Sequence, residues 1–101
     1  MTIKIQPTDG KGTPPGKLAD AELHFNDGPL EGLKLIGFSI RERKTGSGRN
    51  VTFPARSYAV NGERRSYAML RPMVDSTAQT RLRDQILEAY AELTGTLEAT
   101  A

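Results

Sequence analysis

The residues best suited to act on a ligand are two arginines and two tyrosines close together in the sequence, Arg56, Tyr58, Arg65 and Tyr67. Arginine presents a planar set of donors that suits phosphate, and a tyrosine ring offers a flat face on which nucleic-acid bases stack. The four residues alternate on both sides of Asn61-Gly62, a pair that favours a two-residue type I′ turn. We therefore expect a β-hairpin that carries all four side chains on one face and binds nucleic acid there. The pattern leaves an alternative open, in which the two tyrosines pack against each other in the core or at a dimer contact.

The predicted turn also fixes which residues of the hairpin face each other. It sets Val60 opposite Glu63, Tyr58 opposite Arg65, Arg56 opposite Tyr67 and Phe53 opposite Leu70. The second face of the hairpin is expected to join the core through Phe53, Ala55, Ala68 and Leu70. If Ile40 of the preceding strand pairs with Phe53, Arg41 also lies on the basic face.

The charge of the chain is concentrated in its middle. Residues 41 to 83 contain ten basic residues, nine of them arginine, and three acidic ones, whereas residues 84 to 101 contain four acidic residues and no basic one. Such a basic segment is typical of a protein with an anionic partner, although a solvated basic surface without a partner is the alternative.

The sequence offers little support for catalysis or cofactor binding. There is no cysteine, and His24 is the only histidine, so neither a metal site nor a nucleophile with its base is indicated. The glycine-containing stretches lack the spacing of a phosphate-binding loop. No apolar run approaches the roughly 20 residues of a membrane span, and the first residues do not have the order of a signal peptide. We expect a non-enzymatic cytoplasmic protein with no metal and no cofactor.

Alternating and helical patterns predict the elements that position these residues. Residues 17–26 alternate as a strand with Ala19, Ala21, Leu23 and Phe25 inward, and residues 33–43 form a second strand with Ile36, Phe38 and Ile40 inward and a bulge near Gly37. The connection at 44–48 leads to the hairpin strands between 51 and 70. Because a proline cannot donate to a strand ladder, the strand around Pro54 is expected to be an edge, a bulge or a dimer junction.

A single helix is predicted after Pro72. Ser76 and Gln79 have the spacing of a capping box, and Gly95 is expected to end the helix. Its apolar stripe consists of Leu82, Ile86, Leu87, Tyr90 and Leu93. The predicted fold is α+β: an antiparallel meander of about four to five strands with one C-terminal helix. We expect a flexible segment at 1–16, one domain at 17–94 and a frayed tail at 95–101.

The segments FPARSY (53–58), AMLRPM (68–73) and ILEAY (86–90) resemble the stage V sporulation protein G (SpoVG, or septation protein) family. The resemblance covers roughly residues 17–93 and implies a small α+β domain. It also implies a homodimer formed by exchange or pairing of strands, and binding to DNA and RNA with limited sequence preference. By position it places Arg56 after the proline, Arg71 where the family usually has a histidine, and Arg81 and Arg83 at the basic start of the helix.

Together, these observations predict a homodimeric nucleic-acid-binding regulator of low sequence specificity. One helix covers only one face of the sheet, so the other face is left for a second protomer or a ligand. The candidate nucleic-acid-binding residues are Arg41, Arg43, Arg56, Tyr58, Arg65, Tyr67, Arg71, Arg81 and Arg83. The alternative function is that of a structural or protein-interaction module with no nucleic-acid ligand.

Overall fold

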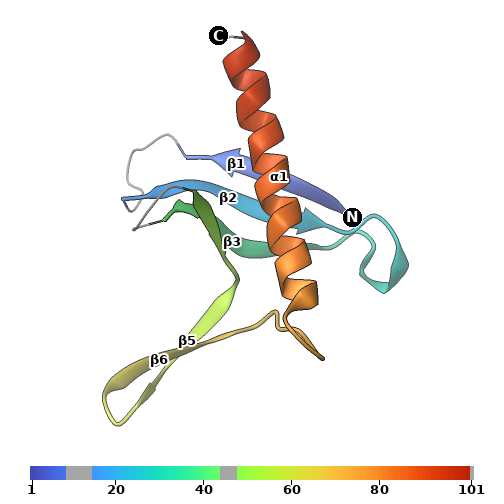
Figure 1. The fold of residues 1–101 in the computed structure, drawn as a ribbon. Helices are drawn as coiled ribbons and strands as arrows, with labels where there is room; N and C mark the ends of the chain where they lie inside the picture. Colours follow the sequence, from blue (N-terminus) through green and yellow to red (C-terminus); the bar gives the residue numbers. More distant parts are fainter. Residues whose placement is uncertain (9–14, 44–47, 101) are drawn as a thin grey trace.

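A four-stranded antiparallel sheet forms the body of the computed structural model, which describes residues 1–8, 15–43 and 48–100 (Figure 1). Its strands, in spatial order, are β1 (Thr2–Pro7), β2 (Lys17–His24), β3 (Lys34–Glu42) and β4 (Arg49–Thr52). The remaining elements are a 3-10 turn, η1 (Gly28–Leu30), a separate two-stranded sheet of β5 (Ala55–Val60) and β6 (Glu63–Ala68), and helix α1 (Thr77–Thr100). The predicted α+β class is confirmed. Residues 9–14 of the flexible segment expected at 1–16, and residues 44–47 of the connection expected at 44–48, lie outside the described residues.

Strand β1 was not predicted, because we expected a flexible segment at 1–16. Residues 2–7 instead pair antiparallel with β2, with Ile3 opposite Leu23 and Ile5 opposite Ala21. Ile3 and Ile5 are half-buried and pack against the core. The alternation of Ile3 and Ile5 is a strand signal, but it is too short to be distinguished from the irregular sequence that follows it.

Strands β2 and β3 confirm the two strands predicted at 17–26 and 33–43. Their inward residues Ala19, Ala21, Leu23, Phe38 and Ile40 are all buried. The prediction was wrong for Ile36, which is 58% exposed. The pairing of the two strands shifts next to this residue, and Gly37 has a φ of 108°. The predicted bulge near Gly37 is therefore present, and it turns Ile36 away from the core.

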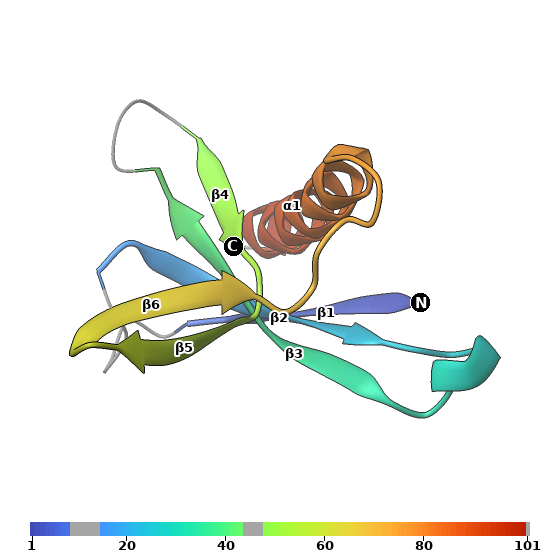
Figure 2. The ribbon, with the colours of Figure 1, turned by 90° about the horizontal axis from the view of Figure 1, so that it is seen from below.

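Helix α1 packs on one side of this sheet (Figure 2). The predicted stripe lies toward the core, with Ile86 and Tyr90 buried and Leu82, Leu87 and Leu93 half-buried. Each fully buried side chain of this size stabilises the fold by about 1.5–3 kcal/mol. The helix does not end at Gly95 but continues to Thr100, since a glycine inside a helix costs only about 1 kcal/mol.

The start of α1 differs from the predicted capping box. The Asp75 carboxylate, rather than the Ser76 hydroxyl, accepts a hydrogen bond from the backbone N–H of Thr77 at 2.9 Å. Hydrogen bonding to the Thr77 side chain, followed by this backbone bond, lowers the pKa of Asp75. The Ser76 carbonyl accepts the N–H of Thr80 at 2.9 Å, which is the first backbone bond of the helix. A side-chain oxygen thus satisfies one of the N–H groups that a helix leaves unpaired at its beginning.

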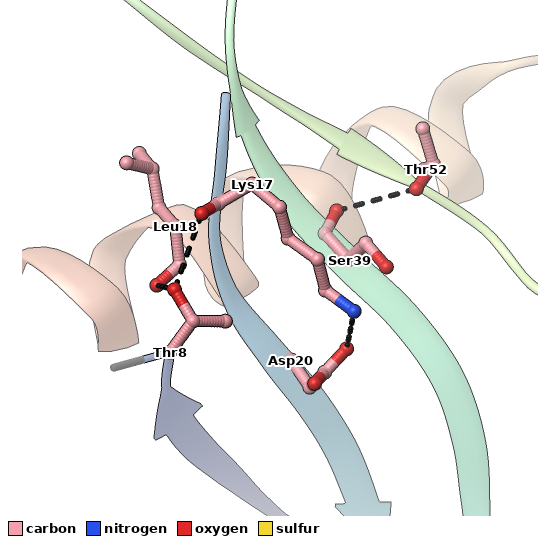
Figure 3. Close-up of polar contacts among 6 residues, drawn as sticks. All are labelled: Thr8, Lys17, Leu18, Asp20, Ser39 and Thr52. Carbon is pink, nitrogen blue, oxygen red and sulfur yellow. Dashed lines mark hydrogen bonds and ion pairs between the residues drawn. The ribbon is translucent and has the colours of Figure 1, made fainter. Parts of the chain in front are cut away.

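The sheet face opposite α1 carries several polar contacts (Figure 3). Lys17 and Asp20 form an ion pair of 2.8 Å there, and the Thr52 hydroxyl donates to the Ser39 carbonyl at 3.4 Å. At the end of β1 the Thr8 hydroxyl lies 3.2 and 3.1 Å from the carbonyls of Lys17 and Leu18. The contacts of Thr52 and Thr8 link neighbouring strands, whereas the Lys17–Asp20 pair lies within β2.

The strand that contains Pro54 is interrupted as expected. Strand β4 ends at Thr52 and β5 begins at Ala55 in the other sheet, so Pro54 lies at the junction of two sheets. The prediction that this segment is not a regularly paired central strand is confirmed. Ile40 pairs with Val51 and not with Phe53, so the condition for placing Arg41 on the basic face is not met. Strands β5 and β6 leave the sheet and do not complete it.

Candidate nucleic-acid interface

The hairpin of β5 and β6 has the predicted turn and register. Asn61 and Gly62 have φ values of 52° and 79°, as a type I′ turn requires. Tyr58 lies opposite Arg65 and Arg56 opposite Tyr67, and Val60 lies opposite Glu63. Since directly opposed residues share a face, the structure brings Arg56, Tyr58, Arg65 and Tyr67 together. We call these four residues the hairpin cluster.

The hairpin extends away from α1 and from the four-stranded sheet (Figure 1). Every residue of both strands is exposed except Ala68, which is half-buried. The prediction that Ala55 faces the core was therefore wrong, because the chain leaves the sheet before this residue. Pairing ends at Ala55 and Ala68, so Phe53 and Leu70 are not ladder partners. Both are half-buried and pack against the core at the base of the hairpin.

The two tyrosines of the hairpin cluster contact each other while remaining open to solvent. Their ring centroids are 5.8 Å apart with the planes tilted by 53°, and each residue is 42% exposed. Arg65 forms an ion pair of 3.3 Å with Glu63, and both side chains are largely exposed. A pair of this kind contributes little to stability, so Arg65 can exchange Glu63 for a phosphate at small cost.

A second basic group lies where the hairpin joins the helix. Arg71 follows β6 and is exposed, and Arg81 is exposed on the second turn of α1. Arg83 is half-buried, with its guanidinium carbon 5.8 Å from the centre of the Phe53 ring. Its Nε is buried and has no hydrogen-bond partner among the described residues. We call Arg71, Arg81 and Arg83 the junction arginines.

The structure places Arg41 and Arg43 in the other sheet, at the end of β3. Arg41 is half-buried and pairs with Asn50 of β4. The Arg43 Nε lies 3.5 Å from the Arg49 carbonyl, a long hydrogen bond. These two arginines thus form a third group, apart from the hairpin cluster. Pairing of Ile40 with Phe53 would have placed Arg41 on the face of that cluster, but Ile40 pairs with Val51.

Arg49 is an exposed basic residue that we did not select from the sequence. Its guanidinium carbon lies 4.9 Å from the centre of the Tyr90 ring, which is close enough for a cation–π interaction. This contact connects the edge strand β4 to α1. The position of Arg49 in the basic middle of the chain was the only sequence signal, and it does not distinguish Arg49 from its neighbours.

His24 is the last residue of the inner strand β2 and belongs to a small ion-pair group. Its Nε2 is 2.9 Å from the Glu22 carboxylate, and the Lys34 ammonium is 3.4 Å from the same oxygen. The hydrogen bond with His24, followed by the charge of Lys34, lowers the pKa of Glu22. Among the described residues, no group of three or more His, Cys, Asp or Glu side chains is placed to hold a metal ion. Nor does that part of the chain contain a helix long and apolar enough to cross a membrane.

Comparisons of the chain with protein-family models, curated proteins and solved structures give no match.

Proposed function

We propose that this protein is a non-enzymatic nucleic-acid-binding protein that contacts DNA or RNA with low sequence specificity. The observation that supports this most directly is the hairpin cluster, in which two arginines and two exposed tyrosine rings share one face of a projecting hairpin. Arginines contact phosphates whatever the sequence, and tyrosine rings stack on any base. The junction arginines add positive charge at the base of the same hairpin.

The protein acts in this proposal as a homodimer in the cytoplasm. A two-stranded hairpin is marginally stable in water on its own, yet among the described strands β5 and β6 pair with each other and with no other. Apolar side chains continue along the segment after the hairpin, where Met73 and Val74 are 98% and 94% exposed. A second protomer that covers part of this surface would stabilise the hairpin. The resemblance to the SpoVG family supports the same assembly and a regulatory role.

A protein-interaction module is the second candidate function. The observation that favours it is the contact between Tyr58 and Tyr67, because exposed tyrosine pairs flanked by arginine are also common at protein interfaces. In that case the hairpin cluster docks a protein and has no affinity for nucleic acid.

A mobility-shift titration at low salt separates the two functions. We expect retardation of duplex DNA, single-stranded DNA and RNA of unrelated sequences. The mass measured by sedimentation in the absence of nucleic acid tests the homodimer independently. Absence of retardation at tens of micromolar protein would favour the protein-interaction module.

A further inference from the structure

A small cavity lies between the base of the hairpin and the start of α1. Its volume is about 130 Å³, and its walls include the apolar side chains of Phe53, Leu70 and Leu82. Drug-sized ligands occupy cavities of roughly 300–1,000 Å³, so this one accommodates a single ring system or one side chain. The cavity is far more apolar than the hairpin beside it.

Two polar side chains also line the cavity, Arg71 and Gln79. Gln79 is half-buried, and its amide, which carries both donors and an acceptor, makes no hydrogen bond to another described residue. Arg71 is exposed and is the one charged side chain among the described residues of the lining. The site thus combines an aromatic wall, a group able to hydrogen-bond a base edge and a cation able to bind phosphate.

The charge around the cavity favours an anionic ligand. The Arg83 guanidinium lies near the Phe53 ring that lines the cavity, and none of the described residues that line it is acidic. Two acidic residues are near the lining in the sequence: Asp75 is engaged with the N–H of Thr77, and Asp84 lines a different hollow of α1. An apolar side chain from a second protomer would fill the space but would leave the half-buried Gln79 amide without a partner, which is unfavourable.

We propose that this cavity, which we call the junction pocket, holds one nucleobase of a single-stranded nucleic acid. The base packs against Phe53, its edge hydrogen-bonds with Gln79, and the adjoining phosphate lies on Arg71. This proposal rests on the nucleic-acid-binding function proposed above and adds a consequence to it. Because a paired base would have to leave its stack to enter, the protein binds single strands more tightly than duplexes of the same length.

A substitution that fills the junction pocket and leaves every charge in place tests this proposal. Ala78 lines the pocket, so Ala78→Leu occupies its space, whereas Ala91→Leu makes the same change at an exposed position of α1 outside the lining. We expect Ala78→Leu to weaken binding of a single-stranded oligonucleotide by roughly 5- to 100-fold. Ala91→Leu should bind as the wild type does, and both variants should bind an abasic oligonucleotide of the same length normally.

Titration of the free protein with a mononucleotide, followed by NMR, tests the pocket without a polymer. We expect the side-chain amide signals of Gln79 to shift, and Gln79→Leu to bind the nucleotide more weakly. If the base-bearing and abasic oligonucleotides bind equally and the Gln79 signals do not move, the proposal that the junction pocket holds a nucleobase is wrong, while the proposed function stands. If Ala78→Leu only converts a dimer to a monomer, the pocket holds a side chain of the second protomer. If no oligonucleotide binds at all, both proposals fail.

Discussion

Gly37 lies directly against Pro54, so that a Cβ atom added at Gly37 would be 3.1 Å from the Cβ of Pro54. Gly37 also has a φ of 108°, a conformation that other residues rarely adopt. At this contact two irregularities meet, the bulge in β3 and the end of β4. Next to this contact the chain leaves the four-stranded sheet and enters the projecting hairpin. The contact therefore determines the position of the hairpin cluster relative to that sheet.

Gly37→Ala should destabilise the fold by about 1–3 kcal/mol, because an alanine at this φ is strained and its methyl group is too close to Pro54. Chemical denaturation measures the change in the free energy of unfolding. Gly95→Ala is the matched control: Gly95 lies within α1, and nothing is within 4 Å of an added Cβ. That variant should be up to about 1 kcal/mol more stable than the wild type. Equal stability of the two variants would contradict this role for Gly37.

The elements that carry their own local signal were predictable from the sequence. Alternation defines β2 and most of β3, and Asn61-Gly62 alone fixes the register that assembles the hairpin cluster. The end of α1 was missed because glycine is only a weak stop when the surrounding residues favour a helix. Strand β1 was missed because its short alternation gains its stability from pairing with β2.

The rest of the candidate site depends on contacts between residues far apart in the sequence. No local pattern indicates that Arg83 lies over Phe53 or that Arg49 lies over Tyr90. The direction of the hairpin was also not predictable, since Pro54 permits an edge, a bulge or a junction equally well. The junction pocket exists only because this direction brings Leu70 next to the first turns of α1.

Replacing arginines of the interface should weaken binding and reduce its dependence on salt. A dimer that uses three or four arginines per protomer should show a slope of log K against log salt of roughly −5 to −7 on duplex DNA. Arg56→Ala, Arg65→Ala and Arg81→Ala should each make this slope shallower by about one unit for every phosphate that is no longer neutralised, and by about two units if the change acts in both protomers. Affinity titrations at several salt concentrations measure the slope.

Arg64→Ala is the control for these variants. Arg64 lies opposite Ala59, on the face of the hairpin away from the hairpin cluster. This variant has the same reduction of net charge as Arg65→Ala, but it should change the slope less. An identical change in both variants would mean that general positive charge, rather than one face of the hairpin, governs binding.

The hydrogen bond of Asp75 should make part of the stability depend on pH. The pKa of Asp75 is lowered in the folded protein, so its contribution is complete above the ordinary aspartate pKa of about 3.9 and is lost as the pH falls through the lower folded value. Asp75→Ala should therefore melt below the wild type at pH 7, and the difference should shrink toward pH 3. Asp75→Asn keeps a hydrogen-bond acceptor that does not titrate. The difference in melting temperature between Asp75→Asn and Asp75→Ala should therefore be the same at every pH. A difference between wild type and Asp75→Ala that grows in acid would contradict this sign.

The last prediction separates the two roles open to the tyrosines of the hairpin cluster. Tyr58→Ala and Tyr67→Ala should each weaken the binding free energy of single-stranded ligands by roughly 1–3 kcal/mol per stacked base. The dependence of binding on salt should stay unchanged, because a ring contributes stacking and no charge.

Tyr58→Phe and Tyr67→Phe keep the ring, so they should retain most of the affinity. Thermal melting and sedimentation of every variant must accompany the titrations, since removal of either ring from the Tyr58–Tyr67 pair can also loosen the hairpin. If the alanine variants bind single strands normally but melt earlier or become monomeric, the rings serve packing between strands or protomers. The arginines alone would then hold the nucleic acid.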